Sequence, residues 1–310
     1  MLHQKSIFKI FSYLFIIAII IFLVFYLKNN WSKITFPELK FDYLYLIISF
    51  ILFALSLIGL ALLWGLILKK LEPANTLTKQ KIITIYLASE LAKYTPGNIW
   101  AIVGRVLWGN QAGASKKNLL ISSFLDSVLA ALSVIELGVI LLFIALGKNW
   151  PNLYPLALVV IIISLIIIHP KIFYPLFNWF FKKIKKEQIL PENFINYLDI
   201  IKINLFYFIV AIFFSLSFLF FVRSFTAFPT PVSLGLMSAF ALSAGLGTIA
   251  LFAPSGLGVR EGILVLILKN FLPAALSVFL SLIFRIWLTV IEILLFSIFW
   301  LYNFFTSQKK

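Results

Sequence analysis

The chain has 310 residues, of which 62% are hydrophobic and 12% are charged, and its formal net charge is +15. Its mean hydropathy of +1.06 excludes a soluble globular protein, because a large share of any globule must face water. The absence of cysteine excludes disulfides, thiolate metal sites and cysteine nucleophiles. With His3 and His169 as the two histidines, neither a histidine metal cluster nor a Ser-His-Asp triad is expected, and we predict no cofactor and no metal.

The positive charge has two interpretations, a nucleic-acid partner or a membrane surface. In a chain this apolar, the second is favoured, because basic loops hold the cytoplasmic face of a membrane protein next to anionic lipids. We therefore expect a membrane lipid as partner and no nucleic acid.

Apolar stretches predict an all-α, polytopic transmembrane helix bundle of about seven to eight spans, in a single integral membrane domain that covers residues 1–310. The first stretch, 7–27, continues at full length without a small-residue cleavage site, so we interpret it as an uncleaved anchor. The later spans are expected at 43–68, 119–146, 153–169, 203–222, 232–252 and 274–304.

Lysine placement predicts the orientation of these spans. Lysines gather before the first span, after the second, before the third and in a basic loop at about 170–202, whereas 147–152 and 223–231 each hold one basic residue. By the positive-inside rule, the N terminus, the 170–202 loop and the C terminus of this cell-membrane protein are expected in the cytoplasm. A cytoplasmic C terminus needs an even number of crossings, so one of two broken stretches must cross or be counted with a neighbour.

The first broken stretch, at about 94–110, contains YTPGNIWAIVGR and follows a predicted interfacial helix, KIITIYLASELAKY. Pro96 and Gly97 end that helix, and Asn98 is a suitable N-cap for a new one. Glycine and asparagine beyond Trp108 keep the new helix to about half of the ~30 Å hydrocarbon thickness. We therefore expect a re-entrant half-helix whose ends are sheltered by protein or water.

The second broken stretch, at about 254–272, contains FAPSGLGVRE. It again has a proline, Pro254, then the glycines Gly256 and Gly258, and then a short apolar helix to about Phe271. An arginine accompanies the break in both stretches, and two interrupted segments in corresponding halves of a membrane protein indicate a central binding site. The alternative is two kinked helices whose arginines extend to the membrane interface.

The arginines and the helix ends together predict an anion site. A helix N terminus carries unpaired N–H groups and partial positive charge, and an arginine adds a planar fork of donors that suits phosphate. Arg260 falls in the first turn of its helix, where glycine would let a ligand approach the backbone closely. Arg105 lies about two turns into its helix, so we expect it to reach across to a neighbour.

Two of the long spans carry polar stripes. Asp126 shares one helical face with Ser122 and Ser133, and Arg285 shares another with Ser281, Thr289 and Glu292. Stripes of this kind face the bundle interior or a wet groove rather than lipid. We expect Asp126 to pair with Arg285.

Other carboxylates have open roles. Glu261, beside Arg260, either neutralises it or receives a cationic headgroup. Glu136 and Glu292 either take part in the site or hold the bundle together. Glu90 is expected on a solvated face of its helix.

The segments KYTPGNIWAIVGR, SKKNLLISSFLDSVL and PSGLGVREG together resemble the transmembrane region of lysylphosphatidylglycerol synthase and the standalone flippase-like proteins built on that region. The resemblance covers about 7–304 and implies a membrane bundle that moves lipids or lipid-linked intermediates between leaflets. The substrate-binding residues that we predict, from the matching motifs and, for Arg285, from its polar stripe, are Pro96, Gly97, Arg105, Asp126, Gly256, Gly258, Arg260, Glu261 and Arg285.

The resemblance has one departure. The soluble domain of the full-length synthase, which transfers lysine from charged tRNA to the lipid, has no counterpart up to Lys310, so we expect no lysyl transfer. The ATP-binding pattern G-x-x-x-x-G-K-[ST] is absent as well. A transporter of this kind would draw on gradients or on downstream consumption of the lipid.

Three functions follow from these features. The first is a flippase for an anionic phospholipid or a polyprenyl-phosphate-linked sugar intermediate, which makes the protein a transporter rather than an enzyme. The second is a membrane-embedded transferase acting on lipid-linked substrates, with Asp126, Glu136 or Glu261 as general base. The third is an accessory partner of a membrane glycosyltransferase, docked through the 170–202 loop.

Overall fold

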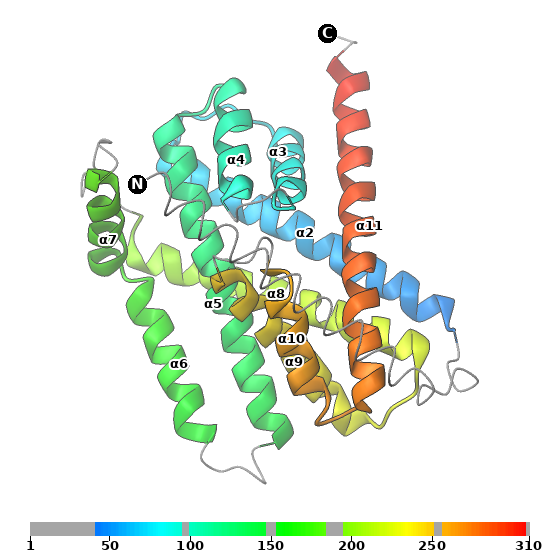
Figure 1. The fold of residues 1–310 in the computed structure, drawn as a ribbon. Coiled ribbons are helices and arrows are strands. Elements are labelled where there is room, and N and C mark those ends of the chain that lie inside the picture. Colours follow the sequence, from blue (N-terminus) through cyan, green and yellow to red (C-terminus); the bar gives the residue numbers. More distant parts are fainter. Residues whose placement is uncertain (1–40, 95–98, 147–152, 184–194, 251–255, 308–310) are drawn as a thin grey trace, which may run out of the picture.

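The computed structural model describes residues 41–94, 99–146, 153–183, 195–250 and 256–307 (Figure 1). This part of the chain contains ten helices and no strand, which confirms the all-α class. The helices are α2 (Tyr43–Leu71), α3 (Lys79–Ala92), α4 (Trp100–Gln111), α5 (Lys116–Leu146), α6 (Leu153–Ile167), α7 (Pro170–Lys183), α8 (Tyr197–Phe225), α9 (Thr230–Ile249), α10 (Val259–Leu268) and α11 (Ala274–Ser307).

Five of these helices, α2, α5, α8, α9 and α11, are long and apolar enough to cross a membrane, and the bent pair of α6 and α7 makes a sixth candidate. The chain is therefore a multi-pass membrane protein. The span expected at 7–27 lies outside the described residues, as do residues 308–310, so the orientation of the termini stays a prediction.

The segment expected as a basic loop at 170–202 is in large part helix. Pro170 occupies the first position of α7, where a missing N–H is tolerated. Phe173, Tyr174 and Phe177 are buried on one face of α7, and burial of this face explains why the segment folds as a helix. Asn196 then begins α8, its side chain accepting a hydrogen bond from the backbone of Leu198.

Two four-helix units make corresponding contacts. In one unit α4 packs between α3 and α5, and in the other α10 packs between α9 and α11. Across the units α2 packs on α8, α5 on α9 and α3 on α11, so exchanging α2–α5 with α8–α11 reproduces the pattern. In Figure 1 α5 descends to the connection with α6 whereas α11 ascends to the C terminus, so the units run in opposite directions. This is the arrangement of an inverted repeat, with α6 and α7 outside it.

Both half-helices are shorter than a span. α4 has 12 residues and α10 has 10, so at ~1.5 Å per residue each covers about half of the ~30 Å hydrocarbon thickness. α4 continues to Gln111, beyond the expected end near Trp108, and stops where Gly113 adopts a φ of 102°. Pro96, Gly97 and Asn98 of the first break, and Pro254 of the second, lie outside the described residues.

Buried phenylalanines hold the unit α8–α11 together beside the start of α10. The rings of Phe218, Phe240 and Phe284 come from α8, α9 and α11, and their centroids lie 4.9 to 5.0 Å apart. Aromatic contacts of this kind fix the relative positions of three helices. The second broken stretch approaches this cluster.

Candidate functional site

Arg105 of α4 is buried in a set of protein partners. Its side chain is 3% exposed and is ion-paired with Asp126 of α5, and its Nη2 lies 2.9 Å from Oε1 of Glu90 in α3. Its Nε donates to the Oγ of Ser89 at 3.1 Å, and its guanidinium lies 4.0 Å from the centroid of the Tyr86 ring. We call these five residues the Arg105 centre. The guanidinium uses all three of its nitrogens on the protein itself.

Asp126 is 1% exposed and accepts a second hydrogen bond, from the hydroxyl of Tyr207 in α8. The expected pair of Asp126 with Arg285 is wrong. α4 packs on α5 and therefore brings Arg105 to Asp126, whereas Arg285 on α11 faces α10 and lies 3.8 Å from Glu261.

A line of alternating charges leads from the Arg105 centre to α11. Lys93 Nζ lies 3.1 Å from Glu90 Oε2 and 2.8 Å from Glu292 Oε1. The hydroxyl of Tyr94 donates to the other Glu292 oxygen at 3.0 Å and also lies 3.0 Å from the hydroxyl of Thr289. The expectation that Glu90 is a solvated residue is wrong, because packing of α3 on α4 and α11 encloses it between two cations.

A second cluster surrounds a small cavity at the start of α10. Among the described residues that line this cavity, two arginines, Arg260 and Arg285, accompany Glu261 and Ser281, and the walls are Phe240, Leu264, Phe284 and Leu288. We call Arg260, Glu261, Ser281 and Arg285 the Arg260 centre. The polar stripe predicted on the last span therefore does face the interior.

The carboxylate of the Arg260 centre is already engaged. Glu261 Oε2 accepts a 2.7 Å hydrogen bond from the backbone N–H of Gly258, at the N terminus of α10, and Oε1 faces Arg285 Nε at 3.8 Å. The Nη2 atom of Arg260 is buried and has no hydrogen-bond partner in the described part of the chain. The Arg260 guanidinium lies 4.9 Å from the centroid of the Phe240 ring.

The glycines of the second break are required by the backbone conformation and by the close approach of α9. Gly256 has a φ of 67°, and a Cβ there would lie 2.7 Å from the carbonyl oxygen of Gly247 in α9. Gly258 has a φ of 80° and caps α10. A Cβ on Gly247 would lie 3.0 Å from the Cβ of Arg260. Glycine at these positions allows α9 to approach the start of α10 and so sets where Arg260 lies.

A family model described as the lysylphosphatidylglycerol synthase TM region matches residues 10–295. The chain belongs to this family. A search of curated proteins found no match. Membership confirms the resemblance read from the broken stretches and gives the protein a role connected with membrane lipids.

The charged residues among the predicted substrate-binding residues fall into two places. Arg105 and Asp126 meet in the Arg105 centre, whereas Arg260, Glu261 and Arg285 meet around the cavity. Gly256 and Gly258, the predicted glycines that the structure describes, shape the entry to α10. Pro96 and Gly97 lie outside the described residues.

Sequence reasoning missed several residues that contact the charged side chains of the two centres and of the line of charges. They are Tyr86, Ser89, Lys93, Tyr94 and Tyr207. One signal was present: Lys93 follows Glu90 by three residues, a spacing at which opposite charges meet on one helix face. The tyrosines gave no signal, because aromatic residues are common throughout this sequence.

Proposed function

We propose that the protein is a flippase for an anionic membrane lipid, and that Arg260 and Arg285 bind the lipid phosphate at the N terminus of α10. The supporting observation is the buried Arg260 Nη2 without a hydrogen-bond partner among the described residues. Buried polar groups in proteins are nearly always satisfied, so an unpaired guanidinium nitrogen indicates a missing acceptor. Phosphate oxygens supply such acceptors in a geometry that arginine matches.

The charges around the cavity favour an anion. Arg260 and Arg285 face one carboxylate among the described lining residues, and Glu261 already accepts a hydrogen bond from Gly258. The partial positive charge of the α10 N terminus adds to this excess. An anionic headgroup would therefore balance the site, with its acyl chains remaining in the bilayer.

The cavity is small in this conformation, about 10 Å³, which is room for about one water molecule. Phosphate entry therefore requires Arg285 and Glu261 to separate, with the phosphate replacing Glu261 as the acceptor that faces Arg285. Arg105 as a direct lipid ligand stays a prediction. In the described conformation we assign it to the ion pairs that join α3, α4 and α5.

The contacts of the carboxylates favour transport over transferase chemistry. Asp126 is held by Arg105 and Tyr207, Glu136 accepts from Asn204 at 3.4 Å, and Glu261 caps α10. A general base needs a free oxygen directed at its substrate. The proposed substrate is an anionic phospholipid or a polyprenyl-phosphate-linked sugar, because both present a phosphate to the arginines.

A liposome assay tests this proposal. The full chain is reconstituted with fluorescently labelled phosphatidylglycerol or a labelled polyprenyl-phosphate sugar, and dithionite quenching reports which label reaches the outer leaflet. We expect translocation of at least one of these lipids by the wild type, and background rates for Arg260→Ala.

The matched control is Lys269→Ala, which removes an exposed cation at the other end of α10 and should transport as the wild type does. Transport by Arg260→Ala at the wild-type rate would refute the phosphate site. Failure of the folded wild type with both lipids would refute the flippase.

A further inference from the structure

The bend between α6 and α7 creates a feature that the two repeated units lack. α6 and α7 meet at 63°, because Pro170 has no N–H to continue the helix. The imidazole Nδ1 of His169 accepts a 3.2 Å hydrogen bond from the backbone N–H of Lys171 and so caps α7. The Tyr197 ring lies 4.5 Å from the His169 ring, and its hydroxyl donates to the Leu165 carbonyl at 3.1 Å.

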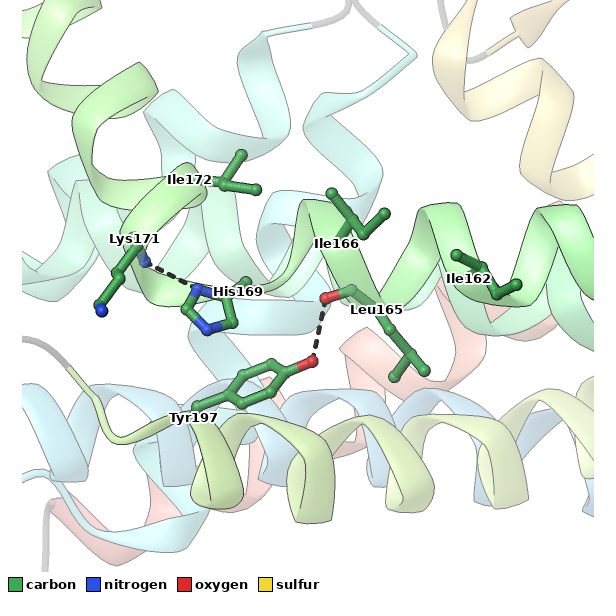
Figure 2. A pocket seen from close by; sticks show the side chains of 7 residues that line it. All are labelled: Ile162, Leu165, Ile166, His169, Lys171, Ile172 and Tyr197. Carbon is green, nitrogen blue, oxygen red and sulfur yellow. Dashed lines mark hydrogen bonds between the residues drawn. The ribbon is translucent and has the colours of Figure 1, made fainter.

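These contacts outline a groove of about 440 Å³ on the outside of the bundle. Figure 2 shows Ile162, Leu165 and Ile166 along α6, with Lys171 and His169 together at one end. The walls are apolar and open to the surroundings, since Ile162 is 54% exposed and Ile166 is 49% exposed. In a membrane this surface faces acyl chains.

The polar end of the groove presents two donors on the same side. Because His169 Nδ1 is an acceptor, Nε2 is the nitrogen that carries a proton and can donate. The Lys171 ammonium is exposed and adds a positive charge beside it. Two donors at the end of an apolar channel match one phosphodiester followed by one acyl chain.

The basic residues that follow the groove in the sequence predict which leaflet supplies the lipid. Lys182 and Lys183 lie at the end of α7, and Lys185 and Lys186 follow them in the sequence. A basic segment next to a span is expected on the cytoplasmic side, where anionic lipids give the membrane a negative surface potential.

We propose that this groove binds one anionic phospholipid of the cytoplasmic leaflet, with its phosphate between Lys171 Nζ and His169 Nε2 and one acyl chain along Ile162, Leu165 and Ile166. This lipid is held and not transported, because its groove is formed by α6, α7 and the start of α8, away from the Arg260 cavity. The bound lipid stabilises the bend between α6 and α7 where it packs on the start of α8. The proposal does not depend on the flippase function.

The test is lipid retention by the full chain, measured by native mass spectrometry after purification from nanodiscs that contain phosphatidylglycerol and phosphatidylcholine. We expect the wild type to retain one phosphatidylglycerol in preference to phosphatidylcholine. Lys171→Glu should reduce this retention about tenfold, since it replaces a charge-assisted contact with repulsion. Lys79→Ala, at another exposed lysine, should leave retention unchanged.

A second variant tests the acyl-chain part of the groove. Ile162→Trp fills the exposed apolar channel and leaves both cations in place, so the lipid should again be lost. Equal retention by Lys171→Glu and the wild type would overturn the proposal, and so would equal retention of the two lipids. Arg260→Ala should keep this lipid; its loss there would assign the lipid to the transport cavity instead.

Discussion

The Arg105 centre and the Arg260 centre place the same residue type on equivalent half-helices, yet they leave it in opposite states. Arg105 has a partner for every guanidinium nitrogen, drawn from α3 and α5. Arg260 has a buried nitrogen for which the described residues supply no acceptor. The inverted repeat therefore gives the two arginines similar backbone surroundings, but their side chains make different contacts.

Position along the half-helix explains this difference. Arg105 is the sixth residue of α4 and can reach carboxylates on the helices at both sides. Arg260 is the second residue of α10, where the adjacent carboxylate, Glu261, is used by the helix N terminus and faces Arg285. We infer that the Arg105 centre stabilises the bundle, whereas the Arg260 centre is completed by a ligand.

The largest expected effect on stability is that of Arg105→Met. It leaves Asp126 buried with Tyr207 as its remaining partner, and removing one member of a buried ion pair costs about 3–5 kcal/mol. Thermal unfolding in detergent micelles should show a large fall in the midpoint.

The double variant Arg105→Met, Asp126→Leu is the control for this prediction. Because it removes both charges, it should recover much of the lost stability. A double variant no more stable than Arg105→Met would contradict the structural role of the pair.

The next largest effect is expected for Gly256→Ala. The left-handed φ and the close approach to the Gly247 carbonyl both oppose a Cβ, so we expect a loss of about 2–3 kcal/mol. The matched control is Gly262→Ala within α10, where the described residues outside the helix's own backbone and the two flanking residues place no atom within 4 Å of the new Cβ. That change should stabilise the helix by up to about 1 kcal/mol, and a loss of similar size in both variants would contradict the conformational argument.

The spans and the breaks of the fold were predictable because they depend on local sequence. Long apolar stretches specify spans, and proline and glycine close together interrupt them, whereas a glycine such as Gly247 stays within its helix. The stripe that holds Arg285 and Glu292 pointed to the interior by its spacing alone, and Glu292 is indeed buried. The family motifs were recognisable for the same reason, because each motif consists of contiguous residues.

The partners of the charges were not predictable, because they depend on which helices meet. Asp126 pairs with Arg105 rather than Arg285, since α4 folds back on α5. Glu90 seemed solvated because α3 is only moderately apolar, but two neighbouring helices cover it. The segment that forms α7 was predicted as a loop because of its lysines, although its aromatic residues form a buried helix face.

A smaller effect is expected for Lys93→Met, which breaks the line of charges between α3 and α11. Glu90 keeps Arg105 and Glu292 keeps Tyr94, so the loss should be about 1–2 kcal/mol by thermal unfolding. Lys70→Met provides a surface comparison, because its pair with Asp199 is about one-third exposed and should be worth less than about 1 kcal/mol. Equal losses in the two variants would show that the line of charges is no stronger than a surface pair.

The smallest effect on stability is expected for Arg260→Leu. Its Nη2 makes no hydrogen bond within the described structure, so the change removes mainly the contacts of the guanidinium with the rings of Phe240 and Phe214. The unfolding midpoint should shift by the equivalent of about 1 kcal/mol or less, while lipid translocation falls to background. A destabilisation as large as that of Arg105→Met would show that the two centres have the same structural role. If Arg260→Leu keeps its stability but no longer transports lipid, Arg260 serves to bind a ligand and not to stabilise the fold.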